Sequence, residues 1–152
     1  MGNYVTNIAK GEHLWFARTA QAGTGGAALV AVVLEATGLE SDDALQDYDT
    51  LAALLAGASN EQTTMGRKTL TGVTKTVDDT TNEASFTADA LVWADATGNP
   101  TGKIVICFDP DGTNTDAAMI PLTVHDFAVT PDGTSITASV GAGGIAVSEN
   151  AA

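Results

Sequence analysis

The sequence is poor in cysteine and in basic residues, and each shortage excludes a class of protein. The only cysteine, Cys107, leaves no intrachain disulfide to form. Its place in the apolar run Ile104–Phe108 predicts a buried, unreactive thiol rather than a nucleophile. Six Lys and Arg against 19 Asp and Glu give a formal net charge of −13, so most faces would repel a nucleic acid. We therefore expect neither nucleic-acid binding nor thiol catalysis.

Long hydrophobic runs are also lacking. The longest, Ala27–Leu34, is far shorter than the roughly 20 residues that cross a bilayer. The N-terminus has neither the basic start nor the continuous apolar stretch of a signal peptide, so we expect no membrane partner. The 152 residues, 44% of them hydrophobic, suffice for one domain with its own core and hardly for two.

The first half of the chain has helical signals. Between Thr24 and Gly38 apolar residues recur at helical spacing, and these two residues suit the start and end of a helix. The β-branched valines of this segment leave a strand as the alternative. A second helix, ending at Gly57, is predicted by an apolar face, with Asp49 or Thr50 as an alternative internal cap. That face consists of Leu45, Tyr48, Leu51, Ala52 and Leu55.

From about residue 67 onward the pattern is that of strands. Thr, Val and Ile dominate, and turn residues recur every ten or so positions, which predicts an antiparallel β-sandwich or barrel. Within Ser135–Val140 the alternation points Ile136, Ala138 and Val140 inward. We expect a mainly β, α+β fold with one or two short helices before the strands. Residues 23–152 would form the single domain, partly helical over 23–66, and residues 1–22 an N-terminal arm or edge strand.

The stretch Asp109–Asp116 is rich in oxygen ligands and invites a calcium-loop interpretation. Counted from Asp109, however, glycine comes fourth instead of sixth and the twelfth position is Ile120 instead of Glu, so the EF-hand template fails. Asp-Pro-Asp-Gly is instead a turn sequence, and Pro131-Asp132-Gly133 predicts a hairpin turn in the same way. A weak, solvent-exposed cation site at Asp109, Asp111 and Asp116 is the minor alternative.

Other candidate sites are weaker still. His125 and Asp126 would need further ligands to close a transition-metal site, and the other histidine, His13, is remote in sequence. Asp78 and Asp79 stand among Thr and Asn, which predicts a turn. We predict no catalytic residue, no cofactor and no metal centre, and therefore a binding or structural role.

Five segments carry a resemblance to a known class of proteins. They are Gly38–Gly57, Arg67–Asn82, Leu91–Asp95, Gly102–Asp111 and Ile120–Gly133. In order and spacing they resemble small structural proteins of tailed bacteriophages, in particular long-tailed phages of actinobacteria, over roughly residues 28–145. The resemblance implies a virion component, without enzymatic activity or cofactor, encoded among head and tail genes.

Within that class the sequence favours the head. A small, acidic β domain suits the capsid exterior, away from packaged DNA, where it would decorate or cement the surface. The expected partners are the major capsid protein and further copies of itself, with a trimer as one option. A tail or neck component is the alternative. A host-surface glycan-binding module is another, with Trp93, Asp95, Asn99 and Asp111 as its site, although strand alternation favours a core position for Trp93.

The aromatic residues gather near the N-terminus. Tyr4, Trp15 and Phe16 precede the segments that should build the core, and Leu14 adds to their apolar area. Residues 12–18 read equally well as an edge strand. We predict these four residues as the partner-binding surface, with Met1–Lys10 as an arm that contacts the capsid or a neighbouring copy.

Overall fold

The computed structural model describes residues 3–81, 83–140 and 144–148. Its helices are α1 (His13–Ala22), α2 (Asp42–Leu45) and α3 (Leu51–Ala56), and a 3-10 turn spans Thr24–Gly26. Its strands are β1 (Tyr4–Val5), β2 (Ala28–Glu35), β3 (Lys68–Thr69), β4 (Thr74–Asp78), β5 (Glu83–Thr87), β6 (Leu91–Trp93), β7 (Thr101–Asp109), β8 (Ile120–Asp126), β9 (Ile136–Ala138) and β10 (Ala146–Ser148). The chain is thus an α+β protein built mainly from antiparallel strands, as the sequence predicts.

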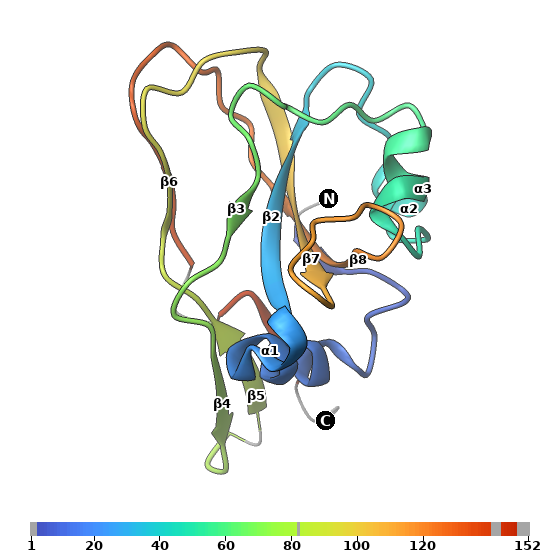
Figure 1. Ribbon diagram of the computed structural model, residues 1–152, viewed down its shortest axis with the longest axis vertical. Coiled ribbons are helices and arrows are strands. Elements are labelled where there is room, and N and C mark those ends of the chain that lie inside the picture. Colours follow the sequence, from blue (N-terminus) through green and yellow to red (C-terminus); the bar gives the residue numbers. More distant parts are fainter. Residues whose placement is uncertain (1–2, 82, 141–143, 149–152) are drawn as a thin grey trace.

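The strands form three sheets, and these do not close into a barrel. The largest has the order β1-β8-β7-β2-β3, the second β10-β5-β4, and the third contains β6 and β9. Figure 1 shows β2 and β7 running through the middle of the molecule, with the β4–β5 hairpin extending at its lower end. Sequence placed the sheet from about residue 67 onward, but its longest pairing joins β7 to β2, which lies well before that position.

Strand β2 replaces the helix predicted between Thr24 and Gly38. Six consecutive residues of it are buried, because Leu29, Ala31 and Val33 pack in one core and the intervening residues in another. A central strand that is covered on both faces reads as a continuous apolar run without a period of two. The helical spacing of its apolar residues is therefore coincidental. The strand, which the β-branched valines left open as the alternative, is correct.

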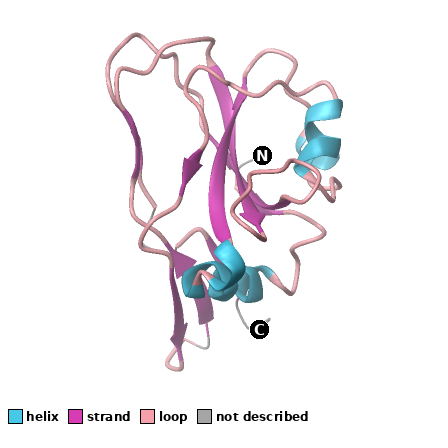
Figure 2. Cartoon of the chain, in the orientation of Figure 1, coloured by secondary structure: helices cyan, strands magenta, loops and turns pink. Residues whose placement is uncertain are grey.

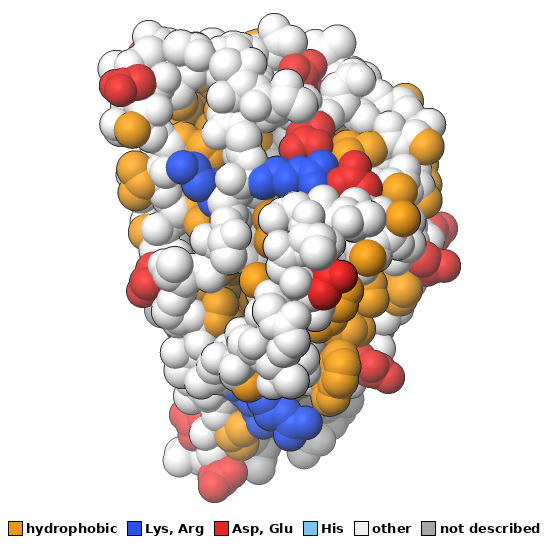
Figure 3. All heavy atoms as spheres, viewed as in Figure 1, with side chains coloured by type: hydrophobic (Ala, Val, Ile, Leu, Met, Phe, Trp, Pro, Cys, Tyr) orange, Lys and Arg blue, Asp and Glu red, His pale blue; other side chains and the backbone are white. Residues whose placement is uncertain are grey.

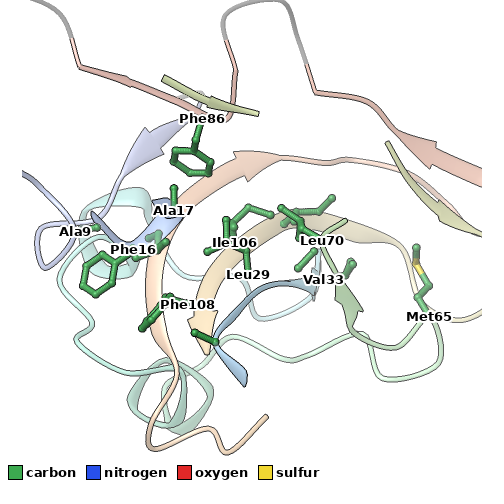
Figure 4. Close-up of a cluster of buried hydrophobic side chains, with 14 of the residues drawn as sticks. Ala9, Phe16, Ala17, Leu29, Val33, Met65, Leu70, Phe86, Ile106 and Phe108 are labelled. Carbon is green, nitrogen blue, oxygen red and sulfur yellow. The ribbon is translucent and has the colours of Figure 1, made fainter. Parts of the chain in front are cut away.

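Two cores lie on opposite faces of the largest sheet. On one face Val30, Val32 and Val105 pack against Leu45 of α2 and Leu51 of α3. The other face is covered by α1 and by the outer strands β5 and β6. Figure 2 shows the helices at two separate places around the strands, and Figure 4 shows side chains of the second core, with Phe16 of α1 beside Phe108 of β7.

The second predicted helix is two short ones, α2 and α3. The Ser41 hydroxyl accepts a hydrogen bond from the Ala44 N–H and starts α2, and the Thr50 hydroxyl accepts one from Ala53 and starts α3. Gly57 ends α3, as predicted. Residues 46–50 interrupt the helix because Asp49 and Thr50 favour hydrogen bonds to nearby backbone over a helix interior.

The N-terminal segment is an integral part of the domain. Residues 13–22 form helix α1 instead of the edge strand predicted over 12–18. The helix places His13, Phe16 and Ala17 in the core at helical spacing. Residues 12–18 also alternate in a way that fits a strand, and this alternation led to the wrong prediction. Before the helix, Tyr4 and Val5 pair with β8 as strand β1, and Thr6 and Ala9 are fully buried.

Of the three predicted turns that contain an Asp pair or Pro-Asp-Gly, those at Asp78 and Asp109 lie between paired strands and the one at Pro131 does not. Asp78 Oδ1 accepts hydrogen bonds from the Thr80 and Thr81 N–H groups and turns β4 into β5. Gly133 has φ 90°, as the Pro-Asp-Gly sequence indicates. Its flanking segments do not pair with each other, because β9 pairs with β6, so the hairpin predicted there is wrong.

Candidate functional site

A hollow in the described part of the chain lies between the largest sheet and the outer strands. It has a volume of about 590 Å³ and is lined from β1, β6, β7, the end of β8, β9 and the residues just before β10. Its apolar lining includes Val5, Leu70, Leu91, Ile104, Ile106, Phe127, Val140 and Ile145. Its polar lining includes Asn3, Asp89, His125, Asp126, Thr137 and Ser139. A cavity of this size with an apolar interior and a few polar groups is the usual form of a ligand site.

The floor of the cavity follows from strand register. Ile104 of β7 lies opposite His125 of β8, and Ile106 lies opposite Thr123, so these side chains share one face of the sheet. Val5 of β1 continues the row because it lies opposite Thr123 on the other side. Val105 and Val124, which alternate with these residues, belong to the core on the opposite face, so the sheet itself separates the cavity from the α2–α3 core.

His125 is the one titratable side chain of the cavity floor. Its Nε2 lies 2.8 Å from the Thr123 hydroxyl. Burial lowers its pKa, and the carboxylate of Asp126 opposes that shift. Neighbours along a strand point to opposite faces, and Asp126 accordingly turns away and accepts a hydrogen bond from Lys103. The His125–Asp126 dyad that would begin a metal site is therefore not assembled.

The opposite face of the sheet carries a buried cation. Lys103 Nζ lies 2.9 Å from Asp42 Oδ1 at the start of α2 and also bonds Asp126 at the end of β8. The Lys103 side chain is 7% exposed and lies 5.8 Å from the centre of the Tyr4 ring. Burial works against its charge, but the bonds to the two carboxylates outweigh it and raise the pKa of Lys103. These contacts join β1, β7, β8 and α2.

The Asp109 loop is organised by its own hydrogen bonds. Asp109 Oδ1 accepts from the Gly112 N–H at 3.1 Å and Oδ2 from the Asn114 N–H at 2.8 Å. Asp116 instead bonds Arg67, which also bonds Glu61. In the part of the chain that the structure describes, no three His, Cys, Asp or Glu side chains lie close enough to hold a metal ion. The structure separates the three carboxylates of the alternative cation site into two different networks.

The sugar site considered from sequence is not formed. Trp93 is 2% exposed and donates from its indole N–H to the Gly66 carbonyl oxygen. Asn99 donates its amide to Glu35, and the Asp111 carboxylate accepts from Thr113. A buried ring offers no stacking face to a sugar, so the core position for Trp93 is confirmed.

The four residues predicted to bind a partner differ in exposure. Phe16 is 8% exposed, and Leu14 is partly buried against the same core. Tyr4 is partly buried under Lys103 on the far side of the sheet. Trp15 is 49% exposed and meets the Phe16 ring edge to face, with ring centres 5.2 Å apart. Hydrophobic side chains are visible on the surface beside α1 in Figure 3. Of the four, Trp15 alone presents much apolar area to solvent.

No pattern in the sequence predicts the cavity. The alternation over Ser135–Val140 did predict the strand that borders it, and Ile136 and Ala138 pack against the core as expected. Which edge of that strand is paired depends on β6, far earlier in the chain, and no local pattern contains this information.

Comparisons with known proteins add no relatives. No family model, no curated protein and no solved structure matches this chain. Among the described residues, none of the helices has both the length and the apolar character that crossing a bilayer requires.

Proposed function

We propose that this chain is a non-enzymatic structural protein of a tailed bacteriophage particle. In this role it decorates or cements the outer surface of the capsid by binding the major capsid protein and other copies of itself. The resemblance of five segments to phage structural proteins supports the proposal. These segments contribute to α2, α3, β7 and β8, which are parts of the central framework rather than of one surface loop.

The observation that best supports a position on the capsid exterior is the charge of the protein. Acidic residues outnumber basic ones by 19 to 6, and Arg67 and Lys103 are already neutralised by ion pairs with Glu61, Asp116, Asp42 and Asp126. In Figure 3 one of the two central groups of basic side chains is bordered by acidic ones. Such a surface would be repelled by packaged DNA, which favours a position outside the shell.

A tail or neck component is the second candidate, and one feature favours it. The β4–β5 hairpin extends from the body (Figure 1), and Val77 on it is 58% exposed. Subunits that stack in rings use such projections to contact the next ring. The two candidates share the virion and differ in location and copy number.

Counting copies in purified particles separates them. Quantitative mass spectrometry of purified virions and of tail-less heads would give hundreds of copies per particle, retained on heads, for a decoration protein. One to six copies per particle, or a few per tail ring, absent from heads, would support the second candidate. Absence from virions of a phage that expresses the protein would refute both.

A further inference from the structure

One wall of the cavity is the edge of a strand. The lining includes four consecutive residues, Thr137, Ala138, Ser139 and Val140. Side chains alternate between the two faces of a strand, so a surface that contacts only one face touches every second residue. Thr137 and Ala138 are the last residues of β9 and point to opposite faces of it, so the strand presents its backbone edge to the cavity. Ser139 and Val140 continue this wall beyond the strand. At about 3.3 Å per residue, the wall is about 10 Å long.

That edge of β9 has no strand beside it among the described residues. β9 pairs on its other side with β6, and these two strands form a sheet of their own. The facing edge strand of the largest sheet is the two-residue β1, which pairs with β8, and the Asn3 side chain accepts a hydrogen bond from the Asp126 N–H. The outer edge of β9 is thus unpaired among the described residues, and Thr137 and Ser139 are exposed to solvent.

We propose that the cavity binds an extended segment of a different protein, which adds as a strand to β9 and places alternate apolar side chains against Ile104, Ile106 and Leu91. Backbone hydrogen bonds to an unpaired edge supply affinity in this kind of recognition, and pockets for every second side chain supply selectivity. The cavity offers both parts together. Such a strand would bind in the same way on a capsid, on a tail or in solution.

The charge of the cavity lining indicates which kind of segment would bind. Asp89 lies in the lining, which contains no Lys or Arg, and the whole chain has a net charge of −13. Asp126, at the margin of the lining, is paired with Lys103. A strand from a second copy of this acidic chain would gain no attraction from the Asp89 carboxylate, whereas a segment with Lys or Arg beside its apolar residues would be attracted. The occupant is therefore a basic, alternating apolar segment of another chain.

Fluorescence anisotropy with two short labelled peptides tests the proposal. In both, Val alternates with Thr; one carries Lys at each end and the other Glu. At low salt we expect the Lys peptide to bind saturably and at least about tenfold more tightly than the Glu peptide, with the difference shrinking as salt is added. Asp89→Asn keeps the oxygen that accepts from Thr71 and should weaken the Lys peptide about threefold. Asp49→Asn, an equal charge change on the other side of the sheet, should not.

Two variants address the cavity and the edge separately. Ala138→Phe fills the cavity with a ring, and Ser139→Pro removes an N–H from the edge at an exposed position. Each should weaken the Lys peptide at least about tenfold. Ser135→Pro, the same change at the other end of β9 and outside the cavity lining, is the matched control. Circular dichroism and thermal unfolding verify that each variant folds. If Ala138→Phe does not fold, Ser139→Pro alone tests the site.

Three results would overturn the proposal. The first is equal binding of the Lys and Glu peptides, and the second is binding that folded Ala138→Phe and Ser139→Pro leave unchanged. The third is dimerisation of the native protein in sedimentation that Ala138→Phe abolishes, since it would make a second copy the occupant.

Discussion

At the residue scale, three buried side chains of this protein donate hydrogen bonds to backbone carbonyl groups distant in sequence. The Thr6 hydroxyl donates to Pro121, the Gln62 amide to Asn99 and the Trp93 indole to Gly66. Leaving such a group unpaired costs about 1–3 kcal/mol. Each bond therefore fixes the position of one segment relative to another as well as satisfying a donor.

Cys107 should be inert in the folded protein. It is 0% exposed in the α2–α3 core, and burial raises the pKa of its thiol, so both access and thiolate formation are suppressed. We expect its reaction with a coloured disulfide reagent near pH 8 to be at least about a thousandfold slower in buffer than in denaturant, because it requires unfolding. Rapid labelling of the native protein would contradict this burial.

Gly133 should be needed for its backbone conformation alone. Its φ is 90°, and a Cβ built there would meet nothing within 4 Å, so a substitution costs strain without a clash. Gly133→Val should lower the free energy of unfolding by about 1–3 kcal/mol. Gly133→Asn, which tolerates positive φ better, should cost less. Urea unfolding measures both, and equal, negligible costs would show that the turn does not hold this conformation.

At the scale of elements, the buried charge of Lys103 links the largest sheet to helix α2. This residue on β7 contacts Asp42 of α2 and Asp126 of β8. The Lys103 hydrogen bond lowers the pKa of Asp42, and the two carboxylates raise that of Lys103 against the effect of burial. The lowered pKa of Asp42 and the raised pKa of Lys103 both mean that the ion pairs stabilise the folded state. They do so over the pH range in which Lys103, Asp42 and Asp126 are all charged.

Lys103→Met should destabilise the domain by about 2–3 kcal/mol near pH 7. Removing one partner of a buried pair typically costs about 3–5 kcal/mol, and the cost is smaller here because Asp126 is 53% exposed. The part due to Asp42 is present above its unfolded pKa of about 3.9 and is lost as the pH falls through its lower folded value. The part due to Lys103 is present below its unfolded pKa of about 10.4 and is lost as the pH rises through its higher folded value.

Urea unfolding of native and variant protein across this pH range measures the effect. The difference between them should be largest in the neutral range and shrink at both ends. Lys103→Met combined with Asp42→Asn should be less destabilising than the sum of the two single changes, because the pair is broken once. A difference independent of pH would mean that the ion pairs do not contribute.

At the scale of the whole molecule, the central sheet is covered on both faces, by α2 and α3 on one side and by α1 and the outer strands on the other (Figures 1 and 2). The two cores share β2 and β7, so neither can be lost without exposing the other face of the same strands. We expect the chain to unfold in a single cooperative transition.

Removal of divalent metal should leave that transition unchanged. Asp109 is occupied by backbone N–H groups and Asp116 by Arg67, so the loop needs no cation to neutralise it. The melting temperature in EGTA should agree with that in calcium within about 1 °C, since a ligand stabilises only the state that binds it. A large drop in EGTA that calcium reverses would place a metal in this loop.

Local chemistry in the sequence determined the turns, the caps and the burial of single residues. The Asp109 and Asp78 turns, the caps at Thr50 and Gly57, and the buried Cys107 and Trp93 follow from interactions within a few residues or from a strong side-chain preference. The net charge is likewise fixed by composition, so the expectation that the protein does not bind nucleic acid follows from the sequence alone.

Tertiary structure decided the rest, because it depends on what covers each segment. β2 is a strand since two layers bury both of its faces, and α1 is a helix since its apolar residues meet β7 and the outer strands. The cavity borders the outer edge of β9, which has no neighbour among the described residues because β9 pairs with β6 alone. An unpaired edge is a property of the assembled sheets, and no local pattern in the chain distinguishes it from a paired one.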